Sequence, residues 1–271
     1  MKRALPVMLA TSLLLCSCSH TLPNANGSPK IMFADSSIEI DKSNWLDVFS
    51  ASLGRVWANQ GAFAELGYGA KDWRVDLDEG TIYFGSERFP VQFLGSQSYL
   101  SNTWLWGWEN INNFQSKVIK TANSVKRIGE TWNLEQFTIP KQDITDTLDG
   151  YMLAIVTASI CSDKVCYYRC KFSEDGAAFV VFSGIPDEVF APVDAMTFMK
   201  ITMQCIQQYT VNHRIFIESF LYQNNTSYSI VDDSIIAHFK SEDSESDLRI
   251  DFEKVDDSWR ISDVHAVLGK S

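Results

Sequence analysis

The sequence has few histidines and none of the short motifs that mark the common enzyme classes. It contains four histidines in 271 residues. The patterns G-x-S-x-G, H-E-x-x-H and G-x-G-x-x-G and the phosphate-binding P-loop are all missing. A Ser-His-Asp hydrolase would have to use His213, His238 or His265. We expect His213 to be hydrogen-bonded and partly buried, and the other two to be exposed on edge or terminal strands. No catalytic residue is assigned, and a binding protein is favoured over an enzyme.

Long apolar runs are also lacking: after residue 18 the sequence has no stretch of 18 apolar residues, the length that a helix needs to cross a bilayer. The start of the chain is different. Lys2 and Arg3 precede an apolar run from Ala4 to Leu15, which is too short for a spanning helix and typical of a signal peptide. We therefore expect residues 1–17 to be a signal peptide.

The four residues from Leu15 to Cys18, Leu-Cys-Ser-Cys, resemble the lipobox of bacterial lipoproteins. Cys18 fits because the small Ser17 precedes it. The resemblance implies cleavage before Cys18 and its acylation by chains such as palmitate, which anchor the protein to the lipid bilayer. In enterobacterial lipoproteins an aspartate directly after the acylated cysteine retains the protein in the inner membrane. Here Ser19 follows Cys18, which favours the outer membrane, facing the periplasm, over the inner one. The alternative is ordinary secretion with cleavage nearby.

Basic residues are scarce. Without residues 1–17 the chain has 21 basic and 34 acidic residues, a net charge of −13. Such a surface is a poor match for nucleic acid or anionic lipid. It suits a basic partner protein or an envelope ligand, as in a protective, immunity-like protein, although a solvated acidic surface is the commoner explanation.

Cysteines are few beyond Cys18, at positions 161, 166, 170 and 205. Their spacing is not C-x-x-C and no histidine is near, so neither a metal nor a cofactor is expected. An exported protein permits disulfides. A disulfide between Cys161 and Cys166 could close the turn between a helix and a strand, which would leave Cys170 with Cys205. Four free, buried thiols are the alternative.

The hydrophobic pattern predicts an α+β fold: an antiparallel meander sheet packed with helices, followed by a smaller helix-plus-antiparallel-sheet unit. Residues 18–40 form a lipidated tether, residues 41–190 a tryptophan-rich domain, and residues 191–271 the C-terminal unit. The expected helices are 44–66 with Ser43 as cap, 110–128, a helix ending at Ser159 with Asp143 or Thr145 as cap, and 194–222. The expected strands are 73–78, 81–84, 89–93, 98–108, 164–172, 177–183, 227–231, 234–240, 247–253 and 258–267.

Several short patterns between residues 73 and 184 resemble a bacterial family known only as domain of unknown function 6882. They are Trp73-x-x-Asp-x-Asp-x-Gly80, Leu94-Gly-Ser, Thr103-Trp-Leu-Trp-Gly-Trp108, Asn110 and Arg127-Ile-Gly129. The chain has Gly107-Trp-Glu-Asn110 where the family usually has Ala-Trp-Ala-Asn. The resemblance implies an α+β domain of unknown activity and assigns no catalytic residue. Trp259-Arg-Ile-Ser-Asp-Val264 is also loosely similar to the closing strands of nuclear-transport-factor-2-like domains.

Three tryptophans, Trp104, Trp106 and Trp108, alternate along one predicted strand and share a face. We expect all three to be core. The functional alternative is a groove in which Trp108, helped by Asn110, stacks on a ligand. Asp76 and Asp78 would share a strand face as a general acid–base pair could, or simply form a solvated face. An envelope-polymer hydrolase therefore stays as the second hypothesis.

Overall fold

The computed structural model describes residues 30–32, 39–68, 71–160, 164–240, 245–256 and 258–267. The expected signal peptide, Cys18 and most of the expected tether fall outside these ranges, as does Cys161.

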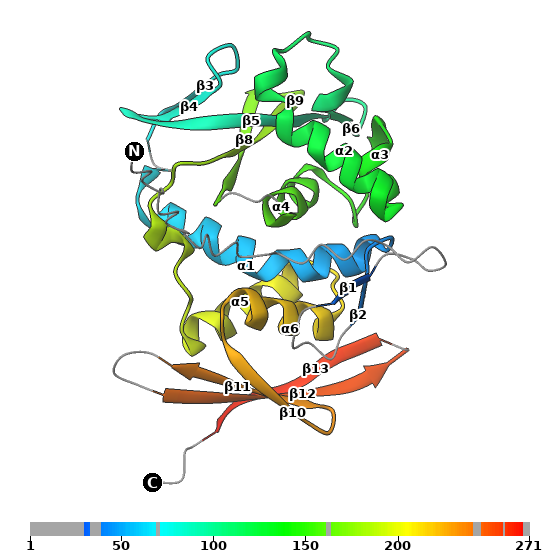
Figure 1. Ribbon diagram of the computed structural model, residues 1–271, viewed down its shortest axis with the longest axis vertical. Coiled ribbons are helices and arrows are strands. Elements are labelled where there is room, and N and C mark those ends of the chain that lie inside the picture. The colour runs from blue at the N-terminus through cyan, green and yellow to red at the C-terminus, as the bar shows by residue number, and fades with distance from the viewer. Residues whose placement is uncertain are drawn as a thin grey trace, which may run out of the picture.

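Helix α1 crosses the middle of the molecule, and a sheet with its own helices lies on each side of it (Figure 1). The helices are α1 (Trp45–Glu65), α2 (Lys120–Trp132), α3 (Glu135–Thr138), α4 (Gly150–Ile160), α5 (Ala195–Gln208) and α6 (His213–Gln223). Short 3₁₀ helices cover Gly107–Glu109, Ser116–Val118 and Asp187–Phe190. The α+β class with antiparallel sheets is confirmed.

The strands form three groups. A small ribbon pairs β1 (Lys30–Met32) with β2 (Glu39–Asp41). The first large sheet holds β3 (Trp73–Asp76), β4 (Thr81–Phe84), β5 (Glu87–Ser98), β6 (Thr103–Trp106), β7 (Lys141–Asp143), β8 (Cys166–Ser173) and β9 (Gly176–Phe182). The second holds β10 (Ser227–Val231), β11 (Ser234–Lys240), β12 (Glu245–Val255) and β13 (Ser258–Val267) in chain order.

The middle of helix α1 is buried on all sides, which is why its sequence there is apolar or small at consecutive positions. Every residue from Val48 to Gly54 is buried. The helix contacts α4 on one side and α5 and α6 on the other. This middle segment must lie between two layers, because no face of it is left for water. Its N-cap is Asn44, whose side chain accepts from the amides of Leu46 and Asp47, and not Ser43 as predicted.

The first large sheet curls until two of its edge strands, β3 and β8, come into contact. The order β3-β4-β5-β9-β8 leaves β3 and β8 each hydrogen-bonded to a single strand. Trp73 of β3 and Tyr168 of β8 nevertheless touch, with ring centroids 5.5 Å apart. The right-handed twist of a long antiparallel sheet permits this curling, and the register shift between Phe93 and Gly95 of β5 adds a local bend.

The expected break between strands 89–93 and 98–108 is wrong, because β5 continues through Gly95 to Ser98. A Cβ atom there would lie 2.4 Å from a ring carbon of Trp104, so the glycine makes room for the indole. Trp104 and Trp106 are 0% and 1% exposed, as predicted for core residues. The strand ends at Trp106, and Trp108 lies in the following 3₁₀ helix, so placing all three on one strand face was wrong.

Three helix predictions are also corrected. The helix expected over 110–128 begins only at Lys120, because Asn110 takes a left-handed conformation that ends the 3₁₀ helix before it. The helix expected over 194–222 is two helices. Asn212 separates them by accepting from the amide of Ile215 and donating its own amide to Ser50. The cap of α4 is Asp149, whose carboxylate accepts from the amide of Met152 at 2.8 Å.

The cysteines that the structure describes are free. Cys166, Cys170 and Cys205 are buried thiols, so the predicted pairing of Cys170 with Cys205 is wrong. Cys166 lies 3.9 Å from the carbonyl oxygen of Asn59 in α1. Its predicted partner, Cys161, lies outside the described residues. Burial raises the pKa of each of the three thiols to about 12, so they are protonated and poorly nucleophilic.

Close packing of α1 on α6 predicts opposite effects for two glycines of the same helix. A Cβ atom at Gly54 would lie 2.5 Å from Cγ of Phe220, whereas nothing lies within 4 Å of one at Gly61. Gly54→Ala should therefore lower the free energy of unfolding by about 1–3 kcal/mol. Gly61→Ala should raise it by about 0.5–1 kcal/mol through helix propensity. Denaturant unfolding measures both, and equal effects would contradict the packing of these helices.

Candidate functional site

A predominantly apolar hollow lies inside the curled sheet. It is a cavity of about 500 Å³ between the facing edges. Its lining comes from Trp73, Arg74, Val75, Leu77, Phe93, Ser96, Asn112, Phe114, Cys170, Phe172 and Ala178. We call this cavity the groove.

Alternation along the strands explains how these side chains reach the groove. On β3, Trp73 and Val75 point inward, and Leu77 follows just past the strand end. On β8, Cys170 and Phe172 do the same. Side chains two residues apart share a face, so each edge strand supplies one wall.

Aromatic rings fill the other end of the curled sheet. Phe63 of α1 lies with its ring centroid 5.1–6.2 Å from those of Phe84, Phe89 and Phe182. The groove lies beside this aromatic cluster and has aromatic residues of its own, Trp73, Phe93, Phe114 and Phe172.

The floor and rim of the groove differ in exposure. Phe93 and Cys170 are buried, whereas Phe172 is 65% exposed. Phe114 packs edge-on against Phe93, with ring centroids 5.0 Å apart. Arg74, Ser96 and Asn112 add polar atoms to a surface that is otherwise apolar. Predominantly apolar lining with a few polar groups, in a volume of ~300–1,000 Å³, is typical of sites for small ligands.

The whole groove lies in the part of the chain that matches a known family. The model of a family of unknown function (DUF6882) matches residues 46–185, just over half of the chain. The chain belongs to this family. No curated protein and no solved structure shows a significant match to it. Every residue that lines the groove falls within the DUF6882 match.

The two residues predicted to bind a ligand lie beside the groove and not inside it. The Trp108 ring is half-buried and packs toward α2, where Lys126 Nζ lies 4.3 Å from its centroid. Asn110 exchanges two hydrogen bonds with the backbone of Phe114, at 2.7 and 3.0 Å. Asn110 therefore holds the loop that carries Phe114 and Asn112 over the groove, while Trp108 faces the other way.

Asp76 and Asp78 do not form the predicted pair on a strand face. Strand β3 ends at Asp76, and Asp78 lies exposed in the turn that follows. The Asp76 carboxylate accepts from the amide of Glu79 at 2.9 Å and lies 3.5 Å from Arg74. This carboxylate stabilises the turn into β4.

His238 and His265 lie on the outer, solvent-facing side of the second sheet. His238 Nδ1 lies 2.9 Å from Asp247, and its Nε2 lies 3.4 Å from the hydroxyl of Ser229. His265 is the more exposed of the two, with 48% of its side chain accessible. The exposure predicted for His265 is confirmed, whereas His238 is only partly exposed and lies on the inner strand β11.

His213 is hydrogen-bonded and buried, as predicted. Its Nδ1 accepts from the amide of Ile261 at 3.1 Å, and Arg260 lies 3.1 Å from Nε2. Burial, and then the positive charge of Arg260, lower its pKa to about 4. A proton on Nδ1 would face an N–H donor, so the neutral ring is the form that fits this site.

The neutral His213 predicts a loss of stability in mild acid. The unfolded chain takes up a proton near pH 6.5, whereas the folded chain resists it down to about pH 4. The free energy of unfolding should therefore fall as the pH drops through this window, by about 2 kcal/mol at pH 5. His213→Gln, whose amide oxygen can accept from Ile261, should remove this part of the pH dependence. Parallel stability curves for the two proteins between pH 7 and 5 would contradict the assignment.

Proposed function

We propose that this protein is a lipid-anchored bacterial envelope lipoprotein whose DUF6882 domain is a binding module. The observation that carries the proposal is the groove between β3 and β8, which is preformed, apolar and open to solvent on one side. Its ligand is an elongated apolar group, of the kind that a fatty acyl chain presents. Rings of Trp73, Phe114 and Phe172 would cover such a chain, and burial of apolar area would supply most of the affinity.

Features of the site favour binding over catalysis. The thiol of Cys170 on the groove floor is protonated, because burial raises its pKa to about 12. The described residues that line the groove include no histidine and no carboxylate. General acid–base chemistry needs such a group within hydrogen-bond reach of the substrate. The groove thus has the surface of a binding site without the side chains of a hydrolytic one.

A variant that fills the groove should abolish binding without removing any packing. Ala178 lies half-buried in the lining, so Ala178→Phe would place a ring where the ligand sits. We expect the Kd for a fluorophore-labelled acyl chain to rise by at least about tenfold, equivalent to about 1.4 kcal/mol. Fluorescence titration measures this, and thermal unfolding checks that the variant is folded.

Two exposed residues provide a matched pair for the same titration. Phe172, on the groove rim, and Leu100, outside it, are 65% and 79% exposed. Phe172→Ala should weaken binding, whereas Leu100→Ala should leave it unchanged. A folded Ala178→Phe variant that binds the acyl chain as the wild type does would refute the groove as the site.

The proposed location of the protein is inferred from the start of the sequence. Among the described residues no helix is long and apolar enough to span a membrane. The lipobox-like residues Leu15 to Cys18 support anchoring through acylated Cys18, with the body of the protein facing the periplasm from the outer membrane. The net charge of −13 without residues 1–17 supports a basic or uncharged partner over nucleic acid.

Anchoring through acylated Cys18 predicts that a variant without this cysteine is lost from the membrane fraction. Cys18→Ala should leave the protein unacylated and outside the membrane fraction, because the anchor is the acyl chains and not the polypeptide. Fractionation with labelled fatty acid measures this, and Cys16→Ala is the matched control that should keep both label and membrane binding. Label retained in Cys18→Ala would overturn the assignment.

An envelope-polymer hydrolase is the second candidate. The observation in its favour is the chain of contacts from Ser229 through His238 to Asp247, which has the order of a nucleophile, a base and its orienting carboxylate. These three side chains lie on an open sheet face, apart from the groove. The binding proposal is preferred because the groove is larger and more apolar than the hollow that His238 helps to line.

A further inference from the structure

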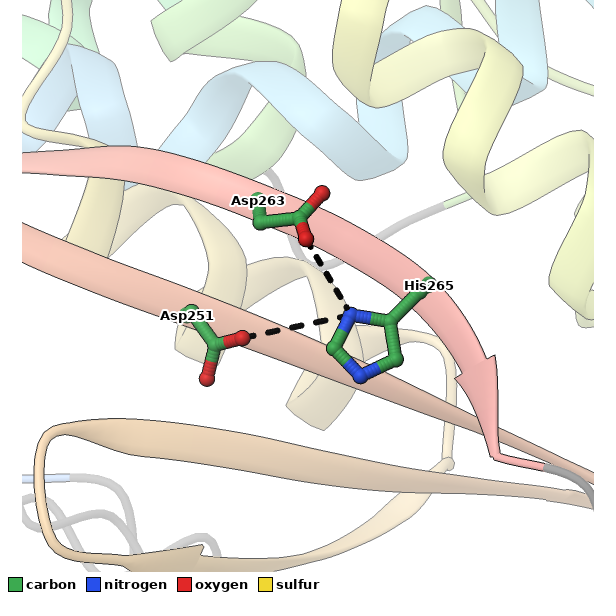
Figure 2. Close-up of side chains that lie close together, drawn as sticks. All are labelled: Asp251, Asp263 and His265. Carbon is green, nitrogen blue, oxygen red and sulfur yellow. Dashed lines mark ion pairs between the residues drawn. The ribbon is translucent and has the colours of Figure 1, made fainter.

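Two carboxylates and one imidazole converge on the outer face of the second sheet. Asp251 lies on β12, and Asp263 and His265 lie on β13. Figure 2 shows the His265 ring with its Nδ1 turned toward both carboxylates. One oxygen from each aspartate and one ring nitrogen all lie within 4.8 Å of one another.

The spacing of these donor atoms is close to that of a metal-bound set. Nδ1 of His265 is 3.4 Å from Asp263 Oδ2 and 3.9 Å from Asp251 Oδ2. Zinc–ligand bonds of ~2.0–2.2 Å at tetrahedral angles place ligand atoms roughly 3.3–3.5 Å apart. Small rotations of the two aspartate side chains would reach that spacing without moving the backbone.

The register of the two strands brings these side chains close together. Asp251 and Asp263 are direct cross-strand partners, and a bulge between Asp251 and Phe252 sets that register. Like charges directly opposite one another are destabilising in a sheet. A bulge re-aims side chains at such positions. A bound cation would turn the repulsion between the two carboxylates into attraction.

Neighbouring groups orient Asp251 for this role. Its Oδ1 accepts from Arg249 Nε at 2.8 Å and from the hydroxyl of Ser234. These contacts occupy one oxygen and direct the other, Oδ2, toward His265. Outer contacts of this kind hold ligating carboxylates in place at metal sites. Arg249 also cancels one of the two negative charges, so the affinity should be moderate.

We propose that Asp251, Asp263 and His265 form a site for a divalent transition-metal ion of the zinc class. The three side chains supply one nitrogen and two oxygen ligands, and water would complete the coordination. Imidazole is a ligand for zinc, copper and nickel, whereas calcium and magnesium take oxygen ligands. The donor set therefore selects zinc over the two alkaline-earth ions. This site is independent of the groove and of its proposed ligand.

Isothermal titration of the folded protein with Zn²⁺ tests the proposal. We expect one Zn²⁺ site that His265→Ala and Asp263→Asn each weaken by at least about tenfold. Titration with Co²⁺ gives a second readout, because its visible absorption reports the nitrogen ligand and should be lost in His265→Ala. These side chains are half-exposed or more, so thermal unfolding should show that both variants remain folded.

The other histidine–aspartate pair on the same face is the control. His238→Ala and Asp247→Asn remove the same kinds of group, but from a pair with a single carboxylate. They should leave the Zn²⁺ affinity unchanged. Zn²⁺ binding that survives His265→Ala, or that the His238 variant weakens equally, would overturn the proposal. Equal binding of Ca²⁺ would also overturn it, because an acidic surface alone would then account for the result.

Discussion

Burial of the middle of α1 on all sides, from Val48 to Gly54, is the constraint on which the rest of the structure depends. Its two opposite faces serve two different layers, so a continuous hydrophobic cluster runs from Trp104 of the first sheet to Phe252 of the second. Small residues let the layers approach, as Gly54 does under Phe220. Ser50 and Ser52 satisfy their hydroxyls on carbonyl groups of α1 itself. The match to DUF6882 ends before α5, yet the packing does not end there.

The groove is a consequence of the same helix. Phe63, near the end of α1, inserts into the curled sheet and gathers the aromatic cluster of Phe84, Phe89 and Phe182. That cluster packs inside the sheet, and the groove lies beside it with Leu77 and Phe172 in its lining. Edge strands β3 and β8 flank the cavity, so these two walls are regular secondary structure. A preformed apolar surface of this kind loses little entropy on binding.

The chemistry that the fold leaves available is narrow. Burial holds the described thiols protonated and keeps His213 neutral. Arg214 and Glu218 are paired at 2.7 Å beneath the second sheet, where neither reaches solvent freely. The reactive groups that remain are on the outer face of that sheet, where histidines stand beside aspartates. The proposed ligand binding in the groove and the proposed cation binding on this face would therefore be separate properties of two layers.

The sequence by itself determined what depends on local pattern. Alternation of period two predicted the antiparallel strands, the buried Trp104 and Trp106, and the class of the fold, because a strand must show one face to a core. It could not show that β3 and β8 face each other, since no local pattern encodes how far a sheet curls. It also could not place Asp263. A regular hairpin from Val255 and Ser258 would pair Asp251 with Ser262, and the bulge moves Asp263 and His265 to the outer face instead. The tertiary structure decided both sites because each joins residues whose distance is set by register and packing, which are properties of the whole sheet.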